Sequence, residues 1–190
     1  EDQVKETFEN YKSAILNDEG EKAVEYVSSK TIQYYSNVLE LVKSADSAEV
    51  EALSILDKLM VFSIRHRTSV EEILSFNGRT LLIYAIKKGM VGKGSVANIT
   101  TGEVIMEDGY VKSRFIANGQ ETPIFFHFYK EEDKWKLDLT SVFPTSEMAM
   151  NKLADDSGTS TNEYLFFLLE MLTKEAPGPE IWVPTAKRAQ

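Results

Sequence analysis

The 190-residue chain contains no cysteine, and this absence excludes several kinds of site at once. Without a thiol the chain cannot form a disulfide, offer a thiolate to a metal or supply a cysteine nucleophile. Histidine is almost as scarce, since only His66 and His127 are present, so a zinc site built from several imidazoles is also excluded. We therefore expect neither a metal centre nor another cofactor.

Positive charge is also in short supply. The 21 lysines and arginines are outnumbered by 30 aspartates and glutamates, which gives a net charge of −9 and a pI of about 4.9. Nucleic acids and anionic membrane surfaces attract proteins through a positive field, so neither is expected as a partner. The acidic residues are spread along the chain, which is typical of a solvated surface rather than an acidic tail.

The sequence lacks any apolar run of about 18 residues, so we expect no membrane span. Hydrophobic residues make up 43% of the chain, and a chain of this size can bury a substantial core, so we expect one domain over residues 1–190. The chain begins at Glu1 rather than Met, as a processed precursor does. We expect an exported protein, periplasmic or on the cell surface, whose signal segment has been removed.

The first ninety residues are predicted to be helical. Apolar residues recur every three or four positions over 2–17, and a second apolar stripe runs over 32–42. The capping pair Asp46 and Glu49 predicts one helix reaching Ile64, and Ser69 with Glu72 forms another capping box. The cations of Arg65-His66-Arg67 are expected to offset the dipole at a helix end.

Between residues 94 and 143 the apolar residues alternate, which predicts about four to five strands. Asp108-Gly109 predicts a hairpin with a type I′ turn, because glycine and aspartate tolerate the positive φ that this turn requires. The predicted register places Met106 opposite Val111 and Glu103 opposite Arg114. Asn118-Gly119 is a second candidate turn, followed by a strand that contains Pro123.

The last hairpin, predicted over residues 124–142, can be assigned residue by residue. A two-residue loop at Glu132-Asp133 gathers the bulky apolar side chains on one face, which we expect the helices to cover. The resulting pairs are Lys130 with Trp135, Phe128 with Leu137, Phe126 with Leu139 and His127 with Asp138.

Two helices are predicted after Pro144. Thr145 is expected to cap a helix that reaches about Asp156, and Ser160 with Glu163 forms a capping box for the last helix. Residues 164–169 are apolar nearly all round that helix, which predicts that it is buried or lies in an interface. The proline-containing tail beyond it is expected to be extended.

The pairing of His127 with Asp138 allows two interpretations. A carboxylate that orients an imidazole is a common general-base arrangement. We favour the other interpretation, a partly exposed polar pair on the sheet face away from the helices. Asp57 is a further candidate base, because it lies on the apolar stripe of its helix; it either turns to the surface or lines a cavity with a raised pKa, and we favour the surface.

Residues 125–139 read Phe-Phe-His-Phe-Tyr-Lys-Glu-Glu-Asp-Lys-Trp-Lys-Leu-Asp-Leu. Preceded by helices and an Asp-Gly hairpin, this segment resembles the nuclear transport factor 2-like (cystatin-like, cone-shaped) superfamily. It is similar in particular to uncharacterised exported bacterial members, in which Phe-Tyr-Lys-Glu-Asp-Gly-Lys-Trp-Lys ends the sheet. Here Lys134 directly follows Asp133, so the usual glycine of that turn is missing. The likeness covers residues 1–143, with a helical insertion at about 44–90 and a C-terminal helical extension at 145–175.

The resemblance implies an α+β fold in which a curved antiparallel sheet wraps around helices. The superfamily includes isomerases, dehydratases, transport adaptors and non-enzymatic binding modules, so likeness alone does not assign an activity. Our first hypothesis is a non-enzymatic module that binds a small apolar ligand or a protein partner. The expected pocket residues are Phe126, Phe128, Leu137, Leu139, Tyr84 and Met60.

Three further hypotheses stay open. One is an isomerase- or dehydratase-type enzyme that uses Asp57, or His127 with Asp138, as a general base. Another is a structural accessory domain with a filled core. The third is a homodimer through the outer sheet face, where Phe125 and Tyr129 flank His127.

Overall fold

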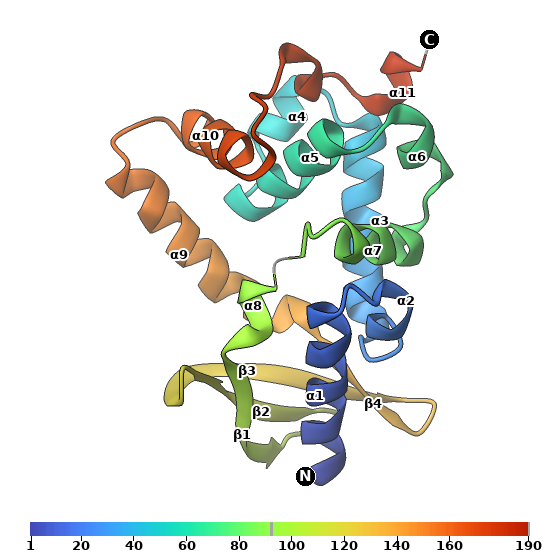
Figure 1. Cartoon of the computed structure of the whole chain (residues 1–190), viewed down its shortest axis with the longest axis vertical. Coiled ribbons are helices and arrows are strands. Elements are labelled where there is room, and N and C mark those ends of the chain that lie inside the picture. Colours follow the sequence, from blue (N-terminus) through green and yellow to red (C-terminus); the bar gives the residue numbers. More distant parts are fainter. Residues whose placement is uncertain (92, 190) are drawn as a thin grey trace. The chain divides into compact units, whose positions relative to one another are not determined.

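A computed structural model describes residues 1–91 and 93–189 of the chain (Figure 1). Its contacts divide the chain into two compact units, Glu1–Tyr35 with Gly78–Val142, and Ser36–Asn77 with Phe143–Gln190. The segments expected as an insertion and an extension contribute most of the second unit. The single domain over residues 1–190 stays a prediction, because the compactness of two units does not test whether they fold separately.

The first unit contains a four-stranded antiparallel sheet with strand order β1-β2-β3-β4, which confirms the α+β class. The strands are β1 (Ile99–Met106), β2 (Val111–Ala117), β3 (Gln120–Glu131) and β4 (Lys134–Asp138). The helices of this unit are α1 (Asp2–Leu16), α2 (Gly20–Ala23), α7 (Gly78–Lys87), α8 (Gly94–Ala97) and the 3-10 helix η1 (Leu139–Val142); α3 (Ser29–Ser44) begins here and ends in the second unit. Strands were predicted over 94–143, and both ends of that range are helical instead.

The β1–β2 hairpin forms as predicted, but with a different turn. Met106 pairs with Val111, whereas of Asp108 and Gly109 only Gly109 has a positive φ, at 81°. The type I′ prediction is therefore wrong here, because that turn needs a positive φ at both positions. It fits the β2–β3 turn instead, where Asn118 and Gly119 have φ values of 50° and 76°.

A register shift between Thr101 and Val104 also changes the predicted pairing of Glu103 with Arg114. The irregularity takes Glu103 out of the ladder, but the side chains still meet, since Arg114 Nη2 donates to Glu103 Oε2 at 3.0 Å. The predicted neighbours are thus joined by an ion pair and not by main-chain pairing.

The β3–β4 hairpin has the predicted register. His127 pairs with Asp138, Phe128 with Leu137 and Lys130 with Trp135. The predicted pair of Phe126 with Leu139 is absent because β4 ends one residue earlier, at Asp138. Leu139 N instead donates to Thr31 Oγ1 at 2.9 Å, and the chain turns into η1.

One face of the sheet forms the core of the first unit. Val111, Phe128 and Leu137 form a cross-strand row, and each is 0% exposed. Helix α1 covers this face (Figure 1), and its Phe8 ring lies 5.0 Å from that of Phe126. Burying each such side chain contributes roughly 1.5–3 kcal/mol, so α1 and this row position the rest of the unit.

The second unit is helical. It contains α4 (Ser47–Glu51), α5 (Ile55–Arg67), α6 (Val70–Ser75), α9 (Phe143–Asp156), α10 (Thr161–Thr173), η2 (Pro179–Trp182) and α11 (Thr185–Arg188). The predicted capping boxes at Asp46, Ser69 and Ser160 are all present.

Three predictions about the second unit are wrong. The single helix predicted to reach Ile64 is two helices, because Ser54 caps α5 by accepting a hydrogen bond from Asp57 N at 3.3 Å. Helix α9 begins at Phe143, before Thr145, because a proline fits the first helical turn, where its missing N–H would have no partner. The tail is not fully extended, since it forms η2 and α11.

Arg65 has a structural role that the sequence did not reveal. Its guanidinium is buried and donates to the carbonyl oxygens of Leu41 at 3.1 Å, Val42 at 3.0 Å and Ala45 at 2.7 Å, which satisfies the open C-terminal end of α3. A fourth bond, of 3.0 Å, reaches Ile181 O in the tail. Burial, with a smaller effect of Arg188, lowers the pKa of Arg65 to about 10, so the side chain remains a cation near neutral pH.

Replacing this guanidinium should destabilise the second unit strongly. We expect Arg65→Ala to lower the free energy of unfolding by about 3 kcal/mol, because the carbonyls of Ala45 and Ile181 lose a buried donor. The carbonyls of Leu41 and Val42 keep only the Ala45 N–H and the Thr185 hydroxyl. Urea denaturation followed by circular dichroism would measure this. The control is Lys152→Ala, which removes an exposed i,i+4 ion pair with Asp156 and should cost under about 0.5 kcal/mol; similar costs for the two variants would refute the role of Arg65.

The β3–β4 turn should be stabilised by introducing a glycine. Glu132 and Asp133 have φ values of 49° and 61°, a conformation that costs a non-glycine residue roughly 1 kcal/mol. We therefore expect Asp133→Gly to raise the free energy of unfolding by about 0.5–1 kcal/mol. Gly119→Ala, at the other two-residue turn, should lower it in the same thermal unfolding assay. A less stable Asp133→Gly variant would show that the turn is not strained.

Candidate functional site

An open cleft in the first unit lies between α1 and the β3–β4 turn. Its volume is about 400 Å³, within the range of roughly 300–1,000 Å³ of cavities that hold ligands. Helix α1 and β4 are neighbours in the unit (Figure 1). The lining is mostly polar and consists of Gln3, Glu6, Thr7, Asn10, Glu25, Tyr26, Asp133, Lys134, Trp135 and Lys136.

The edge of the sheet faces this cleft at Trp135. Strand β4 is the last in the sheet, and its edge is covered at Leu137, whose N–H donates to Tyr26 O at 2.7 Å while its carbonyl accepts from Ser28 N at 2.8 Å. Two residues earlier in the strand, the main chain of Trp135 points the same way. Its carbonyl accepts from Thr7 Oγ1 at 3.3 Å, but no described residue accepts its N–H.

The two walls of the cleft differ in how their polar groups are used. On the hairpin wall, Lys136 Nζ donates to the carbonyl of Glu25, and Asp133 pairs with Lys130 at 3.4 Å. On the α1 wall, no described residue hydrogen-bonds to the side chains of Gln3, Glu6 or Asn10. The α1 wall therefore offers amide and carboxylate groups to a ligand without first breaking internal bonds.

His127 lies on the opposite face of the sheet from the core. Its ring is 4.8 Å from that of Tyr110, which also lies 5.7 Å from the ring of Tyr129. Lys30 Nζ lies 3.8 Å from the centre of the Tyr129 ring. Burial lowers the pKa of His127, and the Asp138 carboxylate opposes this shift only in part, so the imidazole is neutral near pH 7.

Asp138 does not orient that imidazole. The carboxylate is 4% exposed, and its Oδ1 accepts hydrogen bonds from Thr140 N at 3.0 Å and Thr140 Oγ1 at 2.7 Å, which caps η1. No described residue hydrogen-bonds to the His127 ring. The expected exposure of this pair is therefore wrong for Asp138, because η1 folds back beside it.

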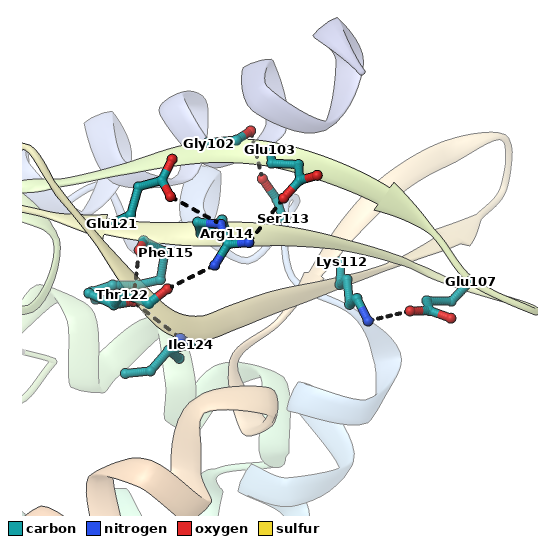
Figure 2. A network of polar contacts seen from close by, with 10 residues as sticks. All are labelled: Gly102, Glu103, Glu107, Lys112, Ser113, Arg114, Phe115, Glu121, Thr122 and Ile124. Carbon is teal, nitrogen blue, oxygen red and sulfur yellow. Dashed lines mark hydrogen bonds and ion pairs between the residues drawn. The ribbon is translucent and has the colours of Figure 1, made fainter.

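Two of the cations on this face of the sheet, Lys112 and Arg114, are paired with acidic side chains. Figure 2 shows Arg114 on β2 between Glu103 and Glu121, with Glu121 Oε2 3.6 Å away, and Lys112 paired with Glu107. Arg114 also lies 4.7 Å from the centre of the Phe125 ring. Phe125 and Tyr129, the aromatic side chains proposed for a dimer surface, are thus each contacted by a cation of the same chain. The homodimer stays a prediction.

The residues predicted to line an apolar pocket do not line this cleft. Phe126, Phe128 and Leu137 are buried in the core under α1, Leu139 opens η1, and Tyr84 lies on α7. Met60 belongs to the second unit. The hypothesis of an apolar ligand in a pocket between sheet and helices stays a prediction.

Asp57 is half-buried in the first turn of α5, in the second unit. It occupies the third position after the Ser54 cap, where a negative charge interacts favourably with the helix dipole. This position explains a carboxylate on an apolar stripe without a catalytic role.

No family model, curated protein or solved structure matches this chain. Among the described residues, no group of three metal-ligating side chains could hold an ion, and no helix has both the length and the apolarity needed to cross a membrane.

Sequence reasoning missed the cleft. The alternation of the last hairpin predicts Trp135 on the core face, although its position on the last strand also predicts an edge. Thr7 interrupts the apolar stripe of α1 and is 8% exposed. Its hydroxyl also donates to Gln3 O in the same helix at 2.9 Å, so α1 alone can satisfy it and the sequence holds no signal of the strand edge.

The pKa of His127 should depend on its burial and on the charged residues around it. We expect an NMR titration to give a pKa below the ordinary value of 6.5, with the signal assigned by His127→Gln. Asp138→Asn should lower this pKa further, and Lys112→Gln should raise it, because Asp138 favours the charged imidazole and Lys112 opposes it. Since the unfolded chain then binds the proton more readily, the protein should lose stability as pH falls from 6.5 toward the lowered pKa. A pKa at or above 6.5 would contradict the half-buried placement.

Proposed function

We propose that this chain is a non-enzymatic binding module that holds a polar, extended segment of a protein partner in the cleft beside Trp135. The observation that carries the proposal is the N–H of Trp135 at an open cleft, opposite polar side chains of α1; within residues 1–91 and 93–189, none of these groups has a hydrogen-bond partner.

The free strand edge favours a polypeptide as the ligand. Extended segments add to exposed sheet edges through main-chain hydrogen bonds. The segment Tyr26–Ser28 already does this within the chain, since it bonds to both main-chain groups of Leu137. A partner segment whose carbonyl accepts from Trp135 N–H would continue the same edge toward the β3–β4 turn.

The side chains of the cleft favour a polar segment. Gln3 and Asn10 can each donate and accept hydrogen bonds, and Glu6 is an acceptor that favours a cation. Tyr26 and Trp135 add two aromatic surfaces against which a planar or cationic group can pack. A ligand without polar groups would leave this wall unpaired.

The enzyme hypothesis has less support. A general base needs a partner that orients it or a proton within reach, and the Asp138 carboxylate is bound to Thr140 instead. The resemblance to the nuclear transport factor 2-like superfamily, which we retain as a proposal, agrees with a binding role because that superfamily includes non-enzymatic modules.

Selection of peptides would test this function. Random eight-residue peptides displayed on phage would be selected on the full chain, and the enriched sequences synthesised with a fluorescent label. We expect binding by fluorescence anisotropy, a shift of the Trp135 amide resonance in ¹⁵N NMR spectra, and at least a tenfold loss of affinity for Glu6→Lys and Trp135→Ala, equal to about 1.4 kcal/mol.

Met106→Ala is the matched control, because this side chain is 72% exposed on β1 and lies outside the cleft lining; it should bind within twofold of the natural chain. Circular dichroism would show whether Trp135→Ala is folded, and Glu6→Lys changes an exposed residue whose side chain has no hydrogen bond or ion pair with a described residue. Peptides that bind all three variants equally, or shift only resonances around His127, would refute the cleft as the site.

A further inference from the structure

Helix α10 has an apolar face that the second unit does not cover. Its inward side is buried, since Leu165 and Leu169 are 0% exposed and the Phe166 ring packs 5.3 Å from that of Phe62. Further apolar side chains lie on another side of the helix. We define the α10 stripe as Tyr164, Phe167, Leu168, Met171 and Leu172.

The stripe has the spacing of a helix-binding surface. Its members follow one another at i, i+3, i+4, i+7 and i+8, so they form one continuous face over roughly 12 Å of helix. Phe167 is 56% exposed, Met171 50% and Leu172 68%. A ridge of this kind packs against another helix that carries apolar residues at the same spacing.

Exposed apolar side chains are concentrated in this part of the chain. Of the eight large hydrophobic residues exposed in the described structure, five lie on α9 and α10: the three above, Met148 and Leu153. Scattered exposed hydrophobic residues need no explanation, whereas a cluster on two consecutive helices marks an interaction site or an aggregation risk.

The charges around the stripe decide which partner fits. On α10 and the two residues that follow it, the acidic residues Glu163, Glu170 and Glu175 outnumber the single lysine, Lys174. A second copy of the chain would bring the same negative charge to the contact, and like charges oppose association. A partner with lysines or arginines beside its apolar positions would be attracted.

We propose that the α10 stripe binds a basic amphipathic helix of a partner protein. This surface belongs to the second unit and the cleft beside Trp135 to the first, so the inference does not depend on the proposed function. The partner helix would lay its apolar side chains on Phe167, Met171 and Leu172, with cations reaching toward acidic residues such as Glu170.

A helical peptide library would test this proposal. Displayed 21-residue helices would carry leucine at fixed heptad positions and a random choice of Lys, Arg, Glu, Gln or Ala elsewhere, and would be selected on the full chain. We expect lysine and arginine to be enriched over glutamate. A synthesised winner should bind at least tenfold more weakly to Phe167→Ser and to Leu172→Ser, and more weakly to Glu170→Lys.

Met106→Ser is the control for a lost exposed apolar side chain and should bind within twofold of the natural chain. Each serine variant replaces a side chain that is more than half exposed, so circular dichroism should show unchanged folding; if one variant unfolds, the other still tests the stripe. Three results would overturn the proposal: no enrichment of cations, equal binding by the stripe variants, or self-association of the natural chain that Phe167→Ser abolishes, which would make a second copy the occupant.

Discussion

The register of the β3–β4 hairpin determines which side chains of these two strands face the core and which groups of β4 lie at the sheet edge. A two-residue turn at Glu132 and Asp133 sets the pairs His127 with Asp138 and Phe128 with Leu137, and a slip of one residue would exchange the two faces. In the observed register Phe128 and Leu137 form the core under α1, and the unpaired edge of Trp135 faces the cleft. The same register brings Asp138 to the place where it caps η1.

The second unit depends on a different kind of interaction. The buried guanidinium of Arg65 joins the end of α3 to the tail through four carbonyl groups. Five donors in a planar arrangement suit this task, whereas the single nitrogen of a lysine has three donors at one point. Because Arg65 holds the tail at Ile181, the ring of Trp182 can pack 4.9 Å from that of Phe62, which also contacts α10. The inward face of α10 is thereby buried, whereas Phe167, Met171 and Leu172 of the α10 stripe stay exposed.

Local signals in the sequence predicted much of this structure. Alternation and turn residues predicted the sheet and the register of its last hairpin, and capping boxes predicted the starts of α4, α6 and α10. One miss has a local cause, since Ser54 is a cap inside an apolar stripe. The other is the Asp108-Gly109 turn, where only Gly109 has a positive φ although the predicted pair of Met106 with Val111 forms. Arg65 and the cleft could not be predicted, since their partners are distant in the sequence.

What the sequence by itself determined are the features that depend on residues a few positions apart: helix caps, two-residue turns, strand alternation and the cross-strand neighbour of His127. Composition also determined that thiol chemistry is absent and that the net charge is negative. Only the tertiary structure decided which polar groups stay unpaired. Arg65 is bound to the end of α3, whereas Trp135 N–H has no acceptor among the described residues. Each outcome depends on which distant main-chain segment approaches the group when the chain folds.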